Sequence, residues 1–201
     1  IPSNDGKFHG SQSLYEALDQ DYSPDDLHDF QLHFSLAVNP VALDINGHNS
    51  STYCVVPINQ TANGNCTEAN LDVQYIMAVA QNVSTVYYYD TSPDDEFMAT
   101  WASELLEMDQ PPLVNSVSYG EYEHLVAPEY ISSFEDSAIK LGAMGVTIFA
   151  SSGDDGVAGY LVRDNVSACG YFPQWPASSP YVTAVGGTQG PENDLPEVAC
   201  T

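Results

Sequence analysis

Apolar residues recur at helical spacing along residues 67–81, and the rest of the chain is organised around this segment. They return every three or four positions at Leu71, Tyr75, Ala78 and Val79, and Ile76 and Met77 widen the apolar face. This period is typical of a helix that buries one face, and it does not fit the alternation of a strand. The sequence therefore predicts an amphipathic or largely buried helix here.

Downstream of this helix, short segments rich in β-branched and aromatic residues alternate with helical patterns. Strands are expected at residues 85–90, 113–118, 145–150 and 181–185, and helices at residues 92–106 and 128–141. Such alternation predicts an α/β fold in which a parallel sheet carries helices on both faces. Functional residues of these sheets gather after the carboxyl ends of strands, which directs attention to residues 118–120 and 152–154.

The chain before residue 67 divides into two parts. Residues 1–36 are interpreted as leading helices, with helical patterns around Leu14, Tyr15 and Leu18 and again after Ser23, which is the expected helix cap. Residues 39–66 are polar and are interpreted as a glycosylated surface excursion in which no strand is expected. Residues 67–188 then form the α/β core.

Composition limits the function classes. The chain has 201 residues, 43% of them hydrophobic, which suits one sizeable core, and no apolar run is long enough to span a membrane. Lys7, Lys140 and Arg163 are the only strong bases, and the net charge of −25 argues against binding nucleic acid or anionic lipid. Because much of this charge is titrated near about pH 4, an acidic working environment is one explanation. Solubility through an acidic surface is the other.

Five Asn-x-Ser/Thr sequons favour a secretory-pathway protein. Glycosylation is expected at Asn49, Asn59, Asn65, Asn82 and Asn165. The chain begins with Ile1 and Pro2, which suggests a processed mature form.

Four cysteines fit the same compartment and allow three pairings among themselves. Cys54 and Cys66 are close enough in sequence to close a short local loop. Cys169 and Cys200 can bond to each other or to another chain. No Cys-x-x-Cys spacing is present, so a zinc site is not expected.

Acidic residues supply the candidate chemistry. Glu68 and Asp72 are four residues apart, so on a helix both carboxylates stand on one face, one turn apart. They either complement the helix dipole or form a pair whose split pKa values suit general acid–base catalysis. A second cluster, Asp154 and Asp155, follows the strand expected at residues 145–150. It is either a tight turn or a functional site, and the spacing of an EF-hand calcium loop is absent.

Four segments in register resemble the sedolisins, the serine-carboxyl peptidases, and most closely their tripeptidyl-peptidase I-like branch. The segments are residues 68–75 (EANLDVQY), 117–120 (VSYG), 149–154 (FASSGD) and 172–188 (FPQWPASSPYVTAVGGT). The resemblance implies that residues 1–201 are the N-terminal part of one acid-active catalytic domain. That domain would have a subtilisin-like α/β fold, completed by a second chain.

The resemblance also implies roles for individual residues. Glu68 matches the base that replaces the histidine of subtilisin-type enzymes, Asp72 the acid that orients this base, and Asp154 the acid that lines the oxyanion hole. A protonated Asp154 can donate a hydrogen bond to an oxyanion, whereas a carboxylate cannot. Substrate-binding positions are implied at Ser118, Tyr119, Gly120, Glu121, Ser152 and Gly153. For Glu121, an exposed loop acid is an equal alternative.

One departure from the family pattern decides the expected partner. The family nucleophile lies in a Ser-Gly-Thr-Ser-type motif, and no Gly-Thr-Ser triplet occurs in this sequence. We therefore expect a second chain that carries the serine and the family's Ca²⁺ site, with no metal site in this chain. The substrates would be peptides or proteins, and the location secreted or a lysosomal or vacuolar acidic compartment. The same branch sends a disulfide from the region of Cys169 to the C-terminal part of the domain. A bond from Cys169 or Cys200 to the partner is therefore expected, with a Cys169–Cys200 bridge as the rival.

Two other function classes compete with a peptidase. A non-catalytic secreted binding module on the same scaffold has no evident need for all three acids. An ordinary Ser-His-Asp hydrolase or a metal enzyme needs a histidine in a nucleophile or ligand motif. None of the five histidines stands in such a motif: His9, His28, His33, His48 and His124.

Overall fold

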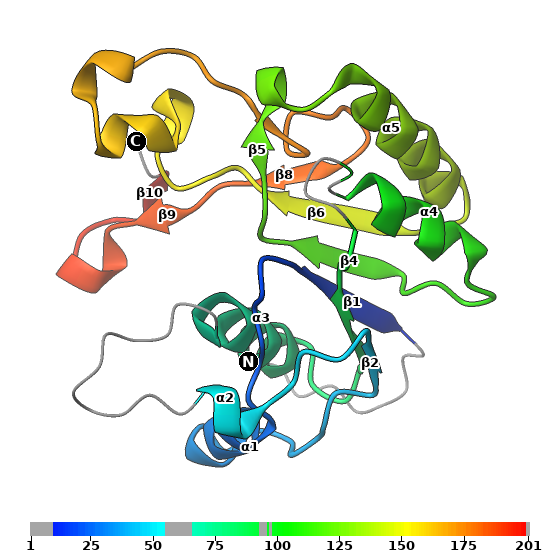
Figure 1. Cartoon of the computed structure of the whole chain (residues 1–201). Coiled ribbons are helices and arrows are strands. Elements are labelled where there is room, and N and C mark those ends of the chain that lie inside the picture. The colour runs from blue at the N-terminus through cyan, green and yellow to red at the C-terminus, as the bar shows by residue number, and fades with distance from the viewer. Residues whose placement is uncertain (1–9, 55–65, 93–95, 97, 200–201) are drawn as a thin grey trace. The chain divides into compact units, whose positions relative to one another are not determined.

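The computed structural model describes residues 10–54, 66–92, 96 and 98–199 (Figure 1). The chain divides into two compact units, and each is described by itself. Unit 1 comprises residues 1–93 and 108–118, and unit 2 comprises residues 94–107 and 119–201.

Unit 1 is built on parallel strands. These are β1 (Ser11–Glu16), β2 (Leu43–Ile45), β3 (Ser84–Tyr89) and β4 (Val114–Val117). Within the unit they lie in the order β2-β3-β1-β4, with Leu14 opposite both Tyr87 of β3 and Ser116 of β4. β1 is therefore an inner strand with a neighbour on each side, and its carboxyl end opens onto the loop at residues 17–23.

The prediction of a helix around Leu14, Tyr15 and Leu18 is wrong, because residues Ser11–Glu16 form β1. The strand is buried along almost its whole length, so it lacks the polar–apolar alternation of a half-exposed strand. Its polar residues are satisfied by neighbouring strands: Gln12 donates to Thr85 Oγ1 at 2.9 Å, and Ser13 donates to Asn115 Oδ1 at 2.6 Å.

The helices of unit 1 are α1 (Pro24–His33), α2 (Ser51–Cys54) and α3 (Thr67–Val79). The predicted start of α1 is confirmed: Ser23 is its N-cap and accepts a hydrogen bond from Asp26 N at 3.0 Å, with Pro24 at the first helical position. α3 confirms the helix predicted from the apolar period at residues 67–81.

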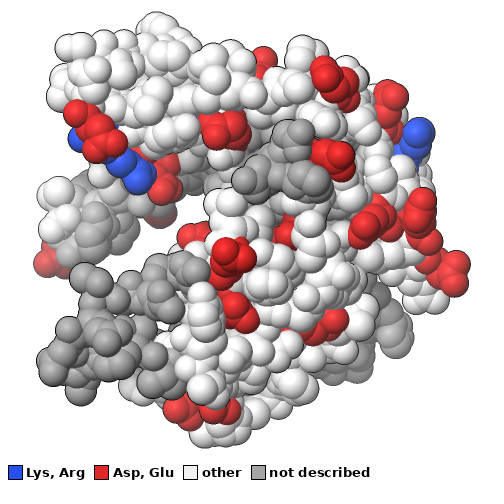
Figure 2. Space-filling model, viewed as in Figure 1, with Lys and Arg blue, Asp and Glu red and all other residues white. Residues whose placement is uncertain are grey.

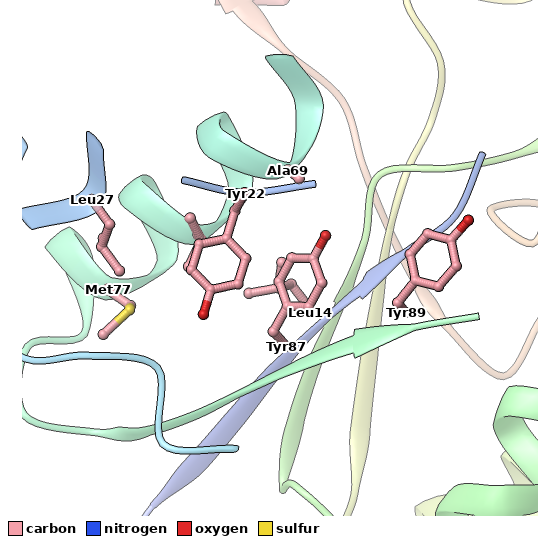
Figure 3. Packing of buried hydrophobic residues seen from close by; sticks show 8 residues of the cluster. Leu14, Tyr22, Leu27, Ala69, Met77, Tyr87 and Tyr89 are labelled. Carbon is pink, nitrogen blue, oxygen red and sulfur yellow. The ribbon is translucent and has the colours of Figure 1, made fainter. Parts of the chain in front are cut away.

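The buried face of α3 differs from the prediction. Ala69, Val73, Met77 and Ala78 are buried, whereas Leu71, Tyr75 and Val79 are 49%, 57% and 65% exposed. Apolar residues occupy two sides of this helix, and the side with the small residues packs into the core. The core cluster joins α1, α3, β1, β3 and the loop after β1 (Figure 3), through Leu14, Tyr22, Leu27, Ala69, Val73, Met77, Tyr87 and Tyr89.

The polar excursion at residues 39–66 contains two short elements. β2 pairs with β3 there, which corrects the expectation that this stretch holds no strand. Only three residues form β2, too few for a sequence pattern to identify. Residues 55–65 lie outside the described part of the chain.

Unit 2 combines two helices with parallel and antiparallel strand pairs. The helices are α4 (Ala99–Glu107) and α5 (Pro128–Ala143), which pack on each other. β6 (Thr147–Ser151) and β8 (Thr183–Val185) are parallel, with Phe149 opposite Thr183. β5 (Glu121–Tyr122) pairs antiparallel with β7 (Gln174–Trp175), and β9 (Thr188–Gln189) with β10 (Val198–Ala199). Short 3₁₀ turns lie at Glu123–Leu125, Gly156–Ala158, Tyr160–Arg163, Val166–Ala168 and Pro191–Asn193.

The strands predicted downstream of residue 67 and the helix predicted at residues 128–141 are confirmed, within a few residues at their ends, by β3, β4, β6, β8 and α5. The helix predicted at residues 92–106 is confirmed as α4, which begins at Ala99 and not at residue 92; residues 93–95 and 97 lie outside the described part of the chain. The α/β class with parallel strands is therefore confirmed. The short pairs β5–β7 and β9–β10 were not predicted, since two-residue strands leave no periodic signal.

Candidate active site

Asp72 lies on α3, one turn after Glu68, and meets two groups of unit 1. Its carboxyl group accepts a hydrogen bond from Ser118, which follows β4, and also bonds to the carboxyl group of Glu16 at the end of β1. Burial raises the pKa of Asp72, and these two hydrogen bonds lower it in part. Two carboxyl groups can hydrogen-bond to each other only when one carries a proton. Asp72 therefore lies beside a second carboxyl group, that of the completely buried Glu16.

Glu68 occupies the first turn of α3 and is half-buried. Its backbone N–H donates to Gln20 Oε1 at 3.2 Å. Since α3 is helical throughout, Glu68 and Asp72 stand one turn apart, as the sequence predicts. The environment of Asp72 goes beyond a helix-dipole contact, because burial and a second carboxyl group both act on it.

A groove of about 300 Å³ runs beside Asp72 along α3. It is lined by Gln12, Leu14, Leu71, Asp72, Tyr75, Ile76, Val79, Ala80 and Ser116. The lining is mostly apolar; its polar side-chain groups are the amide of Gln12, the hydroxyls of Tyr75 and Ser116, and the carboxyl group of Asp72. The exposed apolar side of α3 is therefore one wall of a groove that Asp72 also lines.

Asp154 lies in unit 2, in the turn that follows β6. The turn depends on Gly153, whose φ of +88° is a conformation that side chains rarely adopt, and on a hydrogen bond from Ser152 N to Val185 O at 2.9 Å. The side chain of Asp154 is 87% exposed, so its carboxyl group is open to an approaching molecule. The position at the carboxyl end of a parallel strand agrees with the sequence prediction.

Arg163 connects this turn to the η5 segment, Tyr160–Arg163. Its Nε and Nη2 donate to the two carboxylate oxygens of Asp155 at 2.8 and 2.7 Å, and Nη2 reaches Asp154 Oδ2 at 3.4 Å. Asp155 therefore binds Arg163 in a bidentate manner, and the contact of Arg163 with Asp154 is weaker. The positive charge of Arg163 lies between two acids that would otherwise repel each other.

The predicted substrate-binding residues at 119–121 adjoin β7. A Cβ placed on Gly120 would lie 3.0 Å from Trp175 O, so a larger residue would fit there only if the neighbouring backbone moved by a few tenths of an ångström. Glu121 accepts hydrogen bonds from its neighbour Tyr122 N at 2.6 Å and from Tyr160 Oη at 3.1 Å. These contacts orient its carboxyl group within the protein; its substrate role stays a prediction.

A second cavity, of about 360 Å³, opens beside the Asp154 turn in unit 2. It is lined by Ser152, Gly156, Val157, Tyr171, Phe172, Pro173 and Gln174. Ser152, one of the predicted substrate-binding residues, thus faces a mostly apolar space.

The structure describes some of the remaining predicted sites. The Cys54–Cys66 disulfide is confirmed. Cys169 is exposed and forms no disulfide with a described cysteine, and Cys200 lies outside the described residues. Among the sequons, Asn59 and Asn65 also lie outside, whereas Asn49, Asn82 and Asn165 are exposed.

Acidic side chains are spread over the visible face of the molecule, with few basic ones among them (Figure 2). Within the described ranges, no group of three or more His, Cys, Asp or Glu side chains is arranged to hold a metal ion. No helix in the same part of the chain is long and apolar enough to cross a membrane.

The structure brings some predicted residues together and adds others. Ser118 meets Asp72 within unit 1, and Gly120, Glu121 and Gly153 all adjoin β7 within unit 2. Sequence reasoning missed Glu16, Gln20, Arg163 and Gln174. Identifying β1 as a strand would have placed Glu16 at a carboxyl end, where such residues are sought.

Comparison with known proteins gives a consistent set of relatives. The chain is 35% identical to tripeptidyl-peptidase 1 of Dictyostelium discoideum over 187 residues, covering 92% of this chain and 28% of that protein. It is 33% identical to tripeptidyl-peptidase 1 of Bos taurus over 188 residues, covering 91% of this chain and 31% of that protein. The chain thus spans less than a third of the length of these relatives. No family model matches it.

Solved structures show the same fold. A Pseudomonas sedolisin, a serine-carboxyl proteinase complexed with pseudo-iodotyrostatin, matches with a TM-score of 0.65 and 24% identity, covering 89% of this chain and 48% of that one. A lanthipeptide protease matches with a TM-score of 0.54 and 17% identity, covering 90% of this chain and 49% of that one. About half of each solved chain therefore has no counterpart in this sequence.

Proposed function

This chain belongs to the sedolisin family, in the branch similar to tripeptidyl-peptidase 1, and from that premise we propose that it is part of an acid-active serine-carboxyl peptidase. The proposed reaction is hydrolysis of peptide bonds in peptide or protein substrates. The observation that carries this proposal is the contact of Asp72 with the buried Glu16, one helical turn after Glu68.

The proposed chemistry uses Glu68 as the general base. A serine Oγ, supplied by a partner chain, attacks the scissile carbonyl carbon while Glu68 accepts the serine proton. Glu68 then returns this proton to the amine as the C–N bond breaks, which leaves an acyl-serine. Water attacks the acyl group in the second half of the cycle, and Glu68 again accepts and returns a proton, releasing the acid and restoring the serine. Asp72 orients Glu68.

Asp154 is proposed to stabilise the oxyanion. In its neutral form it donates a hydrogen bond to the negative oxygen of the tetrahedral intermediate. The side chain is 87% exposed, which leaves its carboxyl group accessible to an oxyanion. The requirement for a protonated Asp154 together with an accepting Glu68 predicts activity at acid pH only.

The partner is proposed to carry the serine nucleophile and to occupy the groove beside Asp72. Leu71, Tyr75 and Val79 leave an apolar wall exposed there, and Asp72, the acid proposed to orient the base, lines the same groove. About half of the solved sedolisin chain has no counterpart in this sequence, and the partner is proposed to supply the equivalent of that half. Burying three such side chains would stabilise the association through the hydrophobic effect.

The Ca²⁺ ion implied by the family is proposed to bind to that partner. Within the described residues, no group of three or more His, Cys, Asp or Glu side chains is arranged to hold it. No catalytic step is assigned to the ion. The secreted or lysosomal location and the glycosylation of the sequons belong to the same proposal, supported by the acidic composition.

The test measures peptide hydrolysis by the purified enzyme that contains this chain, from about pH 3 to 8. Glu68→Gln is compared with Glu129→Gln, a matched control in which the first-turn acid of α5 is replaced. We expect Glu68→Gln to lower kcat by roughly 10²–10⁴-fold and the control to retain full activity. Equal activity of the two variants, or a maximum above pH 7, would refute the mechanism. Tripeptide substrates with free and blocked N-termini distinguish a tripeptidyl-peptidase from an endopeptidase.

A separate experiment tests the partner. Val79→Asp places a charge in the groove, and Val166→Asp places one at an equally apolar site that is 80% exposed in unit 2. The variants are purified in reductant, which breaks any interchain disulfide, and mass spectrometry then shows whether a chain with a Ser-Gly-Thr-Ser-like motif still copurifies. We expect loss with Val79→Asp only. Copurification with both variants, or activity of this chain without any partner, would show that the groove does not bind the nucleophile-bearing chain.

A further inference from the structure

Helix α3 begins without a side-chain cap from its own N-cap residue. Cys66 occupies that position and makes no capping hydrogen bond within the described part of the chain, and its sulfur is bonded to Cys54. The first backbone N–H groups of a helix have no acceptor inside the helix, so they need one from elsewhere. Glu68 carries one of these N–H groups.

Gln20 supplies the acceptor from 48 residues away. Its side-chain oxygen Oε1 accepts the hydrogen bond from Glu68 N at 3.2 Å. A side-chain oxygen at this point interacts favourably with the positive end of the helix dipole. The amide of Gln20 therefore contacts the one residue of α3 that the proposed mechanism uses as base.

Gln20 is itself anchored through its backbone. Its N–H donates to Ala17 O at 3.1 Å, and its carbonyl oxygen accepts from Tyr87 Oη at 2.9 Å. Tyr87 belongs to β3 and is completely buried in the core. The backbone of Gln20 is thus held by one hydrogen bond within the loop and one from a side chain of β3, and its own side chain reaches α3.

The loop that begins at β1 touches α3 at both of its acids. Glu16 bonds to the carboxyl group of Asp72, and Gln20 bonds to the backbone of Glu68. We infer that Gln20 is a positioning residue that sets the location of the Glu68 carboxylate, an inference that rests on the proposed function. A residue that merely stabilised the helix would change the amount of folded enzyme, and a positioning residue changes kcat of the folded enzyme.

The experiment compares three substitutions in the complete enzyme. Gln20→Ala removes the acceptor, Gln20→Asn shortens its reach, and Gln20→Glu keeps an acceptor oxygen at the same reach whether ionised or protonated. Gln81→Ala is the matched control, because Gln81 Oε1 also accepts from a backbone N–H, that of Ala37, at 3.0 Å in unit 1. We expect Gln20→Ala and Gln20→Asn to lower kcat about tenfold with unchanged KM. Gln20→Glu and Gln81→Ala should keep the wild-type kcat.

Amide hydrogen exchange at Glu68 gives a readout independent of activity. We expect faster exchange of the Glu68 N–H in Gln20→Ala and wild-type protection in Gln20→Glu and Gln81→Ala. An unchanged kcat in folded Gln20→Ala, or an equal loss in Gln20→Glu, would overturn the positioning role. Unchanged protection of Glu68 in Gln20→Ala would overturn it as well. A wild-type enzyme without peptidase activity would refute the proposed function instead, and loss of protection in Gln20→Ala would still identify Gln20 as the cap of α3.

Discussion

The amide side chain of Gln174 on β7 lies against Gly153 in the turn that holds Asp154. A Cβ on Gly153 would lie 2.7 Å from Gln174 Cδ and 2.9 Å from Nε2, so an alanine there must displace the amide. The contact connects the oxyanion-hole candidate to the strand pair that carries Glu121. Because of this contact, the shape of the turn at Gly153 depends on Gln174, and the sequence alone does not show that the two residues are neighbours.

Gly153→Ala is expected to reduce activity more than stability. Gly145 provides a matched control, because its φ of +87° is nearly the same and a Cβ on it would meet nothing within 4 Å. Both alanine variants lose about 1 kcal/mol from the positive φ, measured as the free energy of unfolding. Only Gly153→Ala moves Gln174 and Asp154, so only its kcat should fall, by about tenfold or more. Equal kcat values in the two variants would contradict this role of the turn.

The stability of unit 1 should depend on pH through Asp72. Burial raises its pKa above the ordinary value of 3.8, so the folded chain keeps this proton where the unfolded chain has released it. This contribution is complete below pH 3.8 and is lost as the pH rises through the folded-state pKa. Asp44, whose pKa is also raised by burial, acts with the same sign.

Asp72→Asn should remove the part of this dependence that comes from Asp72. Urea unfolding of the enzyme at about pH 3.5 and 6.5 measures it, with the exposed Asp29→Asn as control. We expect the difference between the two pH values to shrink for Asp72→Asn and to persist for the control. A difference as large as that of the wild type in Asp72→Asn would show that the Asp72 carboxyl group does not contribute.

Sequence patterns predicted those elements whose signals are local. The strand at β6, its Gly153 turn and the Ser23 cap of α1 all depend on residue types within a few positions. The existence of α3 followed from its apolar period. Which side of α3 is buried did not, because Leu71 and Val73 are both apolar and only tertiary packing selects between them.

The missed parts depend on partners distant in sequence. β1 contains polar residues such as Gln12, which is buried because Thr85 on β3 receives its hydrogen bond. The roles of Glu16 and Gln20 depend on their contacts with α3, which lies about 50 residues further along the chain. A single sequence shows which residue types are present, but it does not show which distant residues will contact each other.

The Cys54–Cys66 disulfide should stabilise the start of α3. It closes a loop with a sequence separation of 12 and joins α2 to the residue just before the first turn of α3. The Cys54→Ser/Cys66→Ser double variant is expected to lose about 3 kcal/mol of unfolding free energy, together with part of the activity. Added reductant should reproduce this loss in the wild type and have no further effect on the double variant. A wild-type enzyme that keeps its stability and activity after full reduction would contradict the prediction.

Cys169 is expected to be bonded to the partner chain. Its side chain is exposed and therefore accessible to a second polypeptide, and the family resemblance sends a disulfide from this region to the C-terminal part of the domain. Non-reducing denaturing electrophoresis of the enzyme should then show one species with the combined mass of the two chains, which reductant separates. Cys169→Ser should release the chains, and the Cys54→Ser/Cys66→Ser variant should leave them joined, since that bridge is internal. After enzymatic deglycosylation, migration of this chain at its own mass of 21.7 kDa without reductant would exclude the interchain bond. In that case, a chain two hydrogen masses lighter than expected for the Cys54–Cys66 bridge alone would identify a Cys169–Cys200 bridge. Packing in the groove beside Asp72 would then be the link between the two chains.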